Sequence, residues 1–509
     1  MISETLRPST AFPWFRIALG VIFLGCLLLR LWRLEQFNTL VFDEIYYPVF
    51  ANRYLTGQFV YNSHPPLSQI LIAVGMWLAS WFPAEPDAIN GLTGAMRSTL
   101  SYRWLNAVAG AAVPVVGGLI GYHLSRRRSF GITAALLLSL DGLLLVESRY
   151  GLNNIYLVLF GLLGHLALLQ GLGDRPRPTV IMRQVRWFRD YRGAKFAQLR
   201  RFSDWVSDRL HFRRPLKPEE HFTLAGFWLG CAAAVKWNGL GFLLAIYGLW
   251  AMSALLRIAL PLNWIKPQAL GFPCNRLATF TPLNLALYFG LVPLLTYSLA
   301  WVPHLLLNPH PNLWQVHRQI LAFHHAVGSG TGVHPYCSPW FSWLLMWRPV
   351  AYFYATARNV SETVPAYPTL PQEAVQVVYD VHGMGNPLLW WGATAAVIAL
   401  LIQLGQNHPQ ERGISLYLLG GYGANLLPWA NISRCTFLYH YMAALIFAVL
   451  ALAYYCDRLC WQRPLTRWHW GIGLITLCAV AFWFWSPLYL GLPLSPASYQ
   501  LRMWFSHWI

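Results

Sequence analysis

Long apolar runs restrict the fold of this chain more than any other feature of its sequence. Residues 14–33, 101–124 and 469–486 are predominantly apolar, and each is close to the roughly 20 residues with which an α-helix crosses a bilayer. Hydrophobic residues make up 56% of the 509 positions and charged residues only 11%, whereas a soluble domain carries about a quarter charged residues. The composition therefore excludes a soluble globular protein and predicts an all-α polytopic membrane protein.

We expect eleven transmembrane helices with polar loops between them. They lie at about 14–33, 101–124, 130–146, 152–170, two within 224–256, 283–302, 387–404, 414–430, one ending near 456, and 469–486. In this arrangement every arginine-rich loop falls on one side of the membrane. Because Lys and Arg are enriched in cytoplasmic loops, we expect a cytoplasmic N-terminus and large outer loops at 34–98 and 304–385. The first run has no small-residue cleavage site, so it is interpreted as a retained span.

The chain carries a net charge of +18, but we do not expect it to bind nucleic acid. Its basic residues collect in the loops between spans, above all in 171–221, where aromatic residues alternate with Arg and Lys. Such a pattern can bind single-stranded nucleic acid. Both neighbours of this segment are expected spans, however, so we interpret it as a cytoplasmic amphipathic segment resting on anionic membrane lipid.

Cysteine and histidine give no sign of a metal site. The eight Cys residues are scattered, without a zinc pattern or an obvious disulfide framework. The loop 304–385 carries six His residues, at 304, 310, 317, 324, 325 and 334, but their spacing matches no known metal motif. The sequence therefore names no certain cofactor, and a divalent cation is left open without support from the spacing.

An Asp-Glu pair follows the first expected span. It lies in the segment 41–47 (VFDEIYY), and His64-Pro65-Pro66-Leu67 follows in the same loop. Adjacent carboxylates beside a membrane are costly unless they are solvated, paired or used. In a structural interpretation, Asp43 caps a helix running to about Tyr54 and Glu44 occupies its first turn; in the other interpretation the pair is catalytic. A second helix, 67–81, is too short to span and is expected in the membrane interface.

Other polar residues lie near the outer ends of the expected spans. They are Arg30, Arg33, Arg103, Asp141, Arg149, Asn154, Lys236 and Arg434. Arg149 belongs to the segment 148–154 (SRYGLNN), and Lys236 interrupts an apolar run at the point where two short spans would meet. An ionisable residue inside such a run indicates a functional site.

These motifs, in this order, resemble those of the protein O-mannosyltransferases, in the bacterial form without a β-trefoil insert. The resemblance implies the GT-C fold, with amphipathic helices in the outer loops, in a bacterial-type plasma membrane. It implies a polyprenyl-phosphate-linked sugar as donor, protein Ser/Thr hydroxyls as acceptor, and an active site on the exoplasmic side with Asp43 as the catalytic residue. It places Arg30 near the lipid phosphate. Where the family has a second acid, five residues after the Arg of its Ser-Arg pair, this chain has Asn154.

The inventory of polar residues suits this chemistry. A phosphate monoester, with a second pKa of roughly 6, leaves without a proton, so transfer needs one base and several cations. Asp43 is the expected base, with Glu44 positioning the acceptor or orienting Asp43. The predicted donor-phosphate ligands are Arg30, Arg103, Arg149 and Lys236, and the predicted acceptor-binding or positioning residues are His64, Asp141, Asn154 and Arg434.

Other functions stay open on the sequence alone. A related lipid-carrier-dependent glycosyltransferase could use another sugar or a lipid acceptor, and charged residues in spans also mark transporters, although no internal repeat is found. We divide the chain into a catalytic region at 1–260, a linker span with a large outer loop at 261–385, and a four-span region at 386–509. The sugar, the acceptor and the pairing of two copies are left open.

Overall fold

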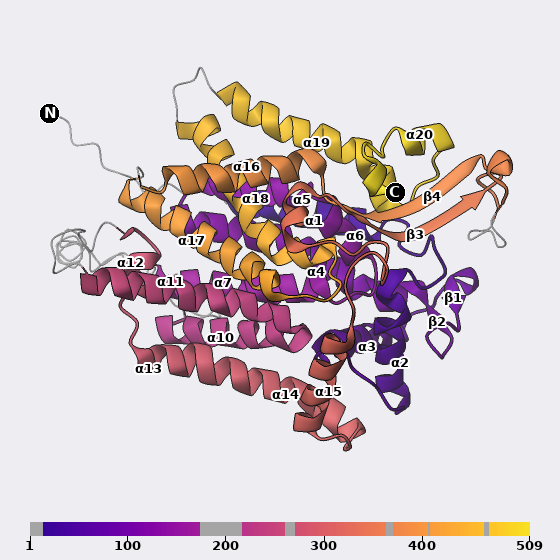
Figure 1. Cartoon of the computed structure of the whole chain (residues 1–509), viewed down its shortest axis with the longest axis horizontal. Helices are drawn as coiled ribbons and strands as arrows, with labels where there is room; N and C mark the ends of the chain where they lie inside the picture. Colours follow the sequence, from indigo (N-terminus) through magenta and orange to yellow (C-terminus); the bar gives the residue numbers. More distant parts are fainter. Residues whose placement is uncertain (1–13, 174–215, 260–269, 363–369, 406–407, 463–467) are drawn as a thin grey trace, which may run out of the picture.

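A computed structural model describes residues 14–173, 216–259, 270–362, 370–405, 408–462 and 468–509. Its long helices run side by side along the longest axis of the molecule (Figure 1). The short helices and strands of the expected outer loops gather at one end of this bundle, and α12 lies at the other end. The basic segment 171–221 lies largely outside the described residues.

The α-helices have the following bounds. They are α1 Trp14–Leu31, α2 Tyr47–Thr56, α3 Leu67–Ala79, α4 Thr99–Ser125, α5 Arg128–Ser139, α6 Gly142–Arg149, α7 Asn154–Leu172, α10 Pro218–Val235, α11 Leu240–Ala259, α12 Cys274–Leu277, α13 Pro282–Asn284, α14 Val292–Leu307, α15 Leu313–Ala326, α16 Pro387–Gln403, α17 Pro409–Leu426, α18 Met442–Asp457, α19 Trp468–Leu490 and α20 Pro496–Gln500. The strands are β1 Ile89–Asn90, β2 Arg97–Ser98, β3 Val350–Ala357 and β4 Val377–Gly383.

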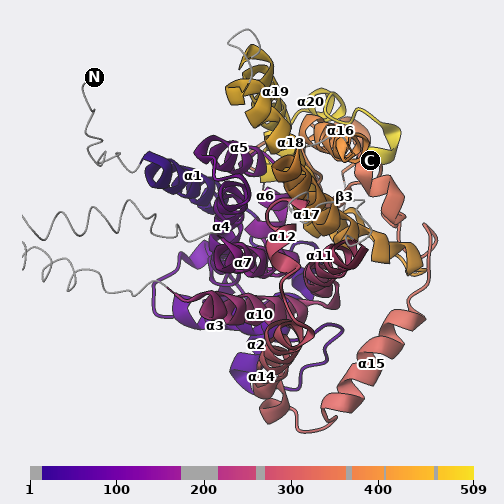
Figure 2. The same cartoon turned by 90° about the vertical axis from the view of Figure 1, so that its left-hand side faces the viewer.

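The core is built around helices that are apolar on every side. Almost every side chain of α18 is buried, and this helix packs against α5, α16 and α17 (Figure 2). A helix that is hydrophobic all round belongs inside a larger assembly of helices. By contrast, less than a third of the residues are buried in the apolar stretches that contain α1, α14 and α19. The outer faces of these helices are therefore free to contact lipid.

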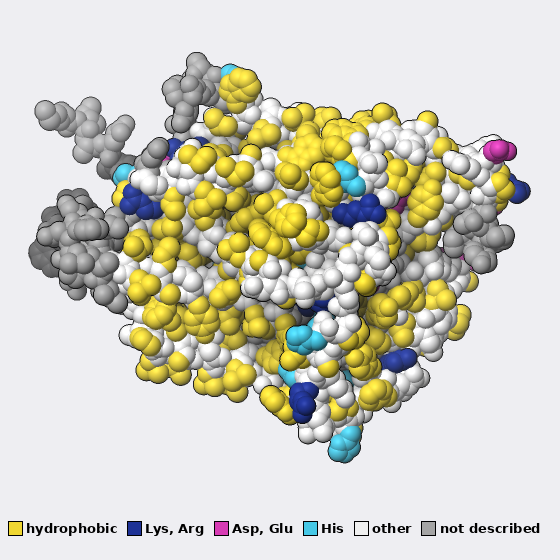
Figure 3. Space-filling view, in the orientation of Figure 1, with side chains coloured by type: hydrophobic (Ala, Val, Ile, Leu, Met, Phe, Trp, Pro, Cys, Tyr) yellow, Lys and Arg dark blue, Asp and Glu magenta, His cyan; other side chains and the backbone are white. Residues whose placement is uncertain are grey.

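Seven helical segments among the described residues are long and apolar enough to cross a membrane, or eight if the bent pair α5 and α6 forms one span. Helices also lie at the three remaining expected positions, but α10 and α17 begin with charged turns and α16 has only 17 residues. The count of eleven therefore stays a prediction, as does the three-part division of the chain. Apolar side chains are spread over the whole face in Figure 3, and few charged ones lie among them. The polytopic helical architecture is confirmed, with short strands in the outer loops as an addition to the all-α prediction.

The two elements that carry the key residues follow the expected outline. In the first outer loop, a 3₁₀ turn at Phe42–Ile45 leads into α2, and α3 occupies most of the expected helix 67–81. The run 224–256 breaks where predicted: α10 ends, Lys236 follows in an extended conformation, and a 3₁₀ turn at Trp237–Gly239 leads into α11.

A β-hairpin in the second outer loop was not expected from the sequence. Strands β3 and β4 pair antiparallel, with an irregularity between Ala351 and Phe353 that leaves Tyr352 outside the ladder. Bulges of this kind re-aim a side chain. Here the ring of Tyr352 stacks on Phe42 at 4.2 Å, so the hairpin packs directly against the loop that carries the Asp-Glu pair.

Candidate active site

Glu44, and not Asp43, makes the local capping contact in the first outer loop. The carboxylate of Glu44 accepts a hydrogen bond of 2.8 Å from the backbone N–H of Val41, the residue before the 3₁₀ turn. Asp43 lies inside this turn, so its interpretation as a helix N-cap is wrong. The intervening Phe42 has a φ of 53°, a left-handed conformation that is rare for a large side chain. Such strain persists where the surroundings dictate it, and it concentrates at functional sites.

Glu44 forms a fully buried ion pair with Arg103. Nε and Nη2 of Arg103 donate to the two carboxylate oxygens at 2.9 and 2.8 Å, a bidentate arrangement. A further bond of 2.7 Å comes from the N–H of Gly151, where a Cβ atom would approach Pro48 and a carbonyl oxygen to 2.9 Å. Glycine is therefore needed for this close approach.

The remaining donors of Arg103 are also used within the protein. They bond to the backbone carbonyls of Leu34, Phe37 and Thr39 at 2.7–3.0 Å. All five N–H groups of the guanidinium are thereby occupied, and none is left for a phosphate. The Glu44–Arg103 pair thus holds the loop that carries Asp43 in shape, which fits the prediction that Glu44 orients Asp43. The donor-phosphate role of Arg103 stays a prediction that these contacts do not support.

Arg149 and Arg30 are likewise committed to the framework. Nη1 and Nη2 of Arg149 donate to the carbonyls of residues 29, 30, 32 and 33, at the C-terminal end of α1. A cation there satisfies carbonyls that have no partner within the helix. Arg30, also buried, donates to Ser148 and to the carbonyl of Cys26. These contacts make both arginines clamps between α1 and α6, and their predicted role as phosphate ligands stays a prediction.

Asp43 lies apart from this framework and beside Lys236. Burial raises the pKa of the Asp43 carboxyl above its ordinary value, and the positive charge of Lys236 opposes that rise. Because successive side chains of a helical turn point in different directions, the two acids of the pair have separate surroundings. Asp43 is thus the member of the pair that takes no part in the ion pair with Arg103, and its catalytic role stays a prediction.

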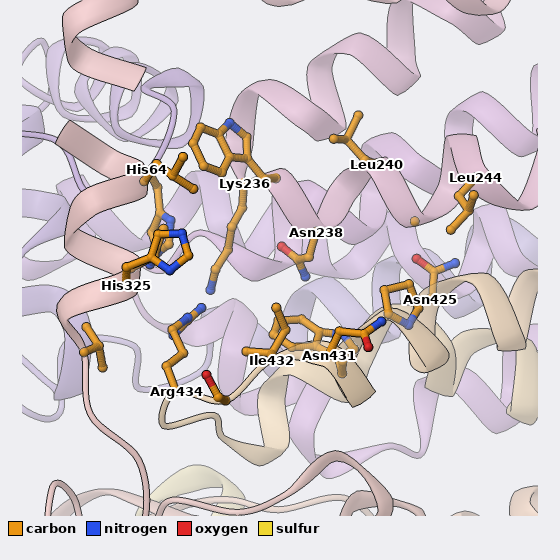
Figure 4. Close-up of a pocket in the computed structure, with 18 of the residues that line it drawn as sticks. His64, Lys236, Asn238, Leu240, Leu244, His325, Asn425, Asn431, Ile432 and Arg434 are labelled. Atoms are coloured by element: carbon orange, nitrogen blue, oxygen red, sulfur yellow. The ribbon is translucent and has the colours of Figure 1, made fainter. Parts of the chain in front are cut away.

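A cavity of about 550 Å³ lies next to Lys236. Lys236 and Arg434 reach into it from opposite walls (Figure 4), with His64 nearby. Burial, and then the charge of Lys236, lowers the pKa of His64 well below its ordinary value, so the ring is neutral. The rest of the lining is largely apolar. It includes Leu240, Leu244, Leu321, Val327, Pro428 and Ile432.

A disulfide holds the loop that presents Arg434. Cys337 and Cys435 are bonded, and the N–H of Cys435 donates to the carbonyl of Gly328 at 2.7 Å. The expectation that the cysteines form no disulfide framework is corrected in this one respect. The two cysteines are 98 residues apart in the sequence, so spacing gave no hint of the pairing.

A buried cluster of polar side chains connects Lys236 to Glu147 and Tyr352. Lys236 Nζ donates to Asn154 at 3.4 Å, and Asn154 donates to Glu147 at 3.2 Å. Tyr352 donates to the other oxygen of Glu147, and the ring of Tyr439 lies 5.4 Å from Lys236 Nζ. The motifs of the sequence did not single out Glu147, Tyr352 or Tyr439 as site residues. An acid at position 147, inside an apolar run, is the one signal that could have identified a member of this set.

Asp141 lies away from the cavity. It caps the N-terminus of α6 by accepting from the N–H of Leu144, and it accepts from the indole of Trp390 at 2.6 Å. These contacts fix α6 against α16, and the predicted acceptor-binding or positioning role of Asp141 stays a prediction. Among the described residues, no group of three His, Cys, Asp or Glu side chains could hold a metal ion.

Two family models match the chain. Residues 20–188 match the model of dolichyl-phosphate-mannose-protein mannosyltransferases, and residues 310–508 match the C-terminal four-span region of protein O-mannosyltransferases. Curated relatives include the polyprenol-phosphate-mannose–protein mannosyltransferase of Mycolicibacterium smegmatis, 26% identical over 92% of this chain and 88% of that protein. The protein of the same name from Corynebacterium glutamicum is 25% identical over 87% of this chain and 81% of that protein.

The fold is shared with a solved structure of this kind. The Saccharomyces cerevisiae protein O-mannosyltransferase Pmt1-Pmt2 complex bound to the sugar donor superposes with a TM-score of 0.62. The match covers 98% of this chain and 93% of the yeast chain at 14% identity. Because the two models match both ends of a chain that spans most of its curated relatives, this multi-pass membrane protein belongs to the protein O-mannosyltransferase family, as the order of its motifs predicted.

Proposed function

We propose that this protein transfers a mannosyl residue from a polyprenyl-phosphate-linked donor to Ser/Thr hydroxyls of proteins on the outer face of the membrane. The observation that carries the proposal is the cavity next to Lys236, the residue whose charge acts on Asp43; this cavity holds two cations and has a largely apolar lining around them. Lys236 and Arg434 suit a phosphate, and the leucines of α11 suit an isoprenoid chain. The named activity of the Mycolicibacterium relative fits this pairing of groups.

The reaction that we propose is a direct displacement. The acceptor hydroxyl oxygen forms a bond to the anomeric carbon as the bond from that carbon to the phosphate oxygen breaks. The proton of the hydroxyl passes to the carboxylate of Asp43, whose raised pKa makes it a better base near neutral pH. Lys236 and Arg434 hold the charge of the leaving phosphate. One displacement inverts the configuration of the anomeric carbon.

A transfer assay tests this function directly. Purified protein in lipid vesicles is given labelled polyprenyl-phosphate mannose and a Ser/Thr-rich peptide, and labelled peptide is the expected product. Label that appears in lipid would favour a lipid acceptor. Label that crosses the vesicle membrane unchanged would favour a transporter. The pairing of two copies stays open.

Loss of either cavity cation is expected to weaken donor binding. Lys236→Met or Arg434→Met removes a charge-assisted contact to the phosphate, and we expect KM for the donor to rise about 10-fold or more. Lys217→Met is the matched control, because Lys217 is exposed at the opposite end of α10. An unchanged KM in both cavity variants would place the phosphate elsewhere.

We also propose that the cavity end of the bundle faces the outside of a bacterial-type plasma membrane. Disulfides persist in oxidising compartments, and Cys337–Cys435 lies beside the cavity. In intact cells, a membrane-impermeant maleimide should label a cysteine placed at Arg318, which is exposed on α15, and should not label one placed at Glu219, at the start of α10. The reverse pattern, or labelling of both, would contradict this orientation.

A further inference from the structure

Glu147 is a second buried carboxylate of the site, beside the Asp43 of the proposed mechanism. It is fully buried on α6, and both of its oxygens are used. One accepts from the hydroxyl of Tyr352, and the other accepts from the amide N–H of Asn154 at 3.2 Å. The amide oxygen of Asn154 in turn accepts from Lys236. Glu147 therefore contacts Lys236 through one intervening side chain.

The charges around Lys236 explain why a contact with Glu147 through Asn154 would hold its ammonium group in place. On its cavity side Lys236 faces Arg434, a like charge, whereas Asp43 and Glu147 attract it from within the protein. In the proposed reaction Asp43 takes up a proton and loses its negative charge. Glu147 takes no part in that proton transfer, so its hydrogen bond to Asn154, and through it the link to Lys236, stays in place throughout the reaction.

We propose that Glu147 is a positioning residue that, through Asn154, fixes the ammonium group of Lys236 at the end of the cavity. We further propose that Glu147 and Asn154 act as an acid–amide pair, which needs one carboxylate, placed at position 147 or at position 154. This inference rests on the proposed function, because it assigns Lys236 to the donor phosphate. The hydrogen bonds make it specific: with Gln at 147 and Asp at 154, the amide still donates to its neighbour, and the new carboxylate still accepts from Lys236.

The test exchanges acid and amide within the pair. Glu147→Gln is expected to weaken binding of a sugar-free polyprenyl phosphate about 10- to 100-fold, because a hydrogen-bonded network around a charged group is broken. The double variant Glu147→Gln/Asn154→Asp is expected to restore binding to within about threefold of wild type. Glu219→Gln, which removes an exposed carboxylate at the far end of α10, is the matched control and should bind normally.

Two results would overturn the inference. One is wild-type binding by Glu147→Gln, and the other is a folded double variant that binds as weakly as the single variant. If Glu147→Gln fails to fold, Asn154→Ala replaces it, because this change cuts the link and keeps the carboxylate. Wild-type binding by that protein would equally overturn the inference.

The lipid-binding readout also separates this inference from the proposed function. A wild-type protein that binds polyprenyl phosphate but never mannosylates the peptide would contradict the transfer reaction. The comparison of binding by the variants would still decide the role of Glu147.

Discussion

The Asp43→Asn protein is expected to fold and to bind donor, but to transfer mannose about 100- to 10,000-fold more slowly than wild type. An amide is nearly isosteric with a carboxylate, but it cannot accept a proton at neutral pH. The structure strengthens this expectation, because the capping bond to Val41 belongs to Glu44. Loss of the Asp43 carboxylate therefore leaves the framework of the loop intact.

Three measurements make this prediction decisive: the initial rate of peptide mannosylation, the affinity for a polyprenyl phosphate, and the midpoint of thermal unfolding. Asp87→Asn is the control, since Asp87 is an exposed acid of the same outer loop. A rate near that of wild type in the Asp43→Asn protein would remove Asp43 from the mechanism.

The main expected effect of Glu44→Gln is a lower stability of the fold. A change at a residue that only positioned the acceptor would instead lower turnover and keep the unfolding midpoint of wild type. Each oxygen of Glu44 accepts from one backbone N–H and from one N–H of Arg103. Whichever way a glutamine amide turns, its NH₂ group faces two donors. Breaking a buried ion pair costs about 3–5 kcal/mol, a large part of the stability of a typical domain.

Thermal unfolding in lipid or detergent measures this effect, and Arg103→Ala should behave in the same way. The Asp43→Asn protein serves as the comparison, because it changes the neighbouring carboxylate without breaking the pair. If Glu44→Gln kept the unfolding midpoint of wild type and still lost turnover, Glu44 would have a direct role at the reacting groups and the framework assignment would be wrong.

Three of the arginine assignments show where inference from the sequence ended. Arg30, Arg103 and Arg149 lie near the outer ends of spans, as predicted, but proximity to that surface does not say what a guanidinium contacts. Apart from the Glu44 carboxylate that pairs with Arg103, the partners of Arg103 and Arg149 are backbone carbonyls 64–120 positions away along the chain. The residues next to each arginine in the sequence therefore do not indicate which carbonyls it contacts.

The sequence by itself determined the helical membrane architecture and two elements of the site. These are the loop with the Asp-Glu pair and the break between spans at Lys236. Apolar runs of spanning length have no stable alternative to helices in a bilayer, because every backbone polar group must be bonded within the segment. The same physics singled out Lys236, since a charge inside such a run is too costly to be incidental. The order of the motifs was enough to identify the family.

Only the tertiary structure decided which charges reach the cavity. The bulge in β3 brings Tyr352 to Glu147 across 205 positions, and the disulfide at Cys435 anchors the loop that brings Arg434 opposite Lys236. These residues meet because a hairpin, a loop and helices that are far apart in the chain pack against one another. Whether a buried charge acts as a clamp or as a ligand depends on the acceptors that this packing places around it.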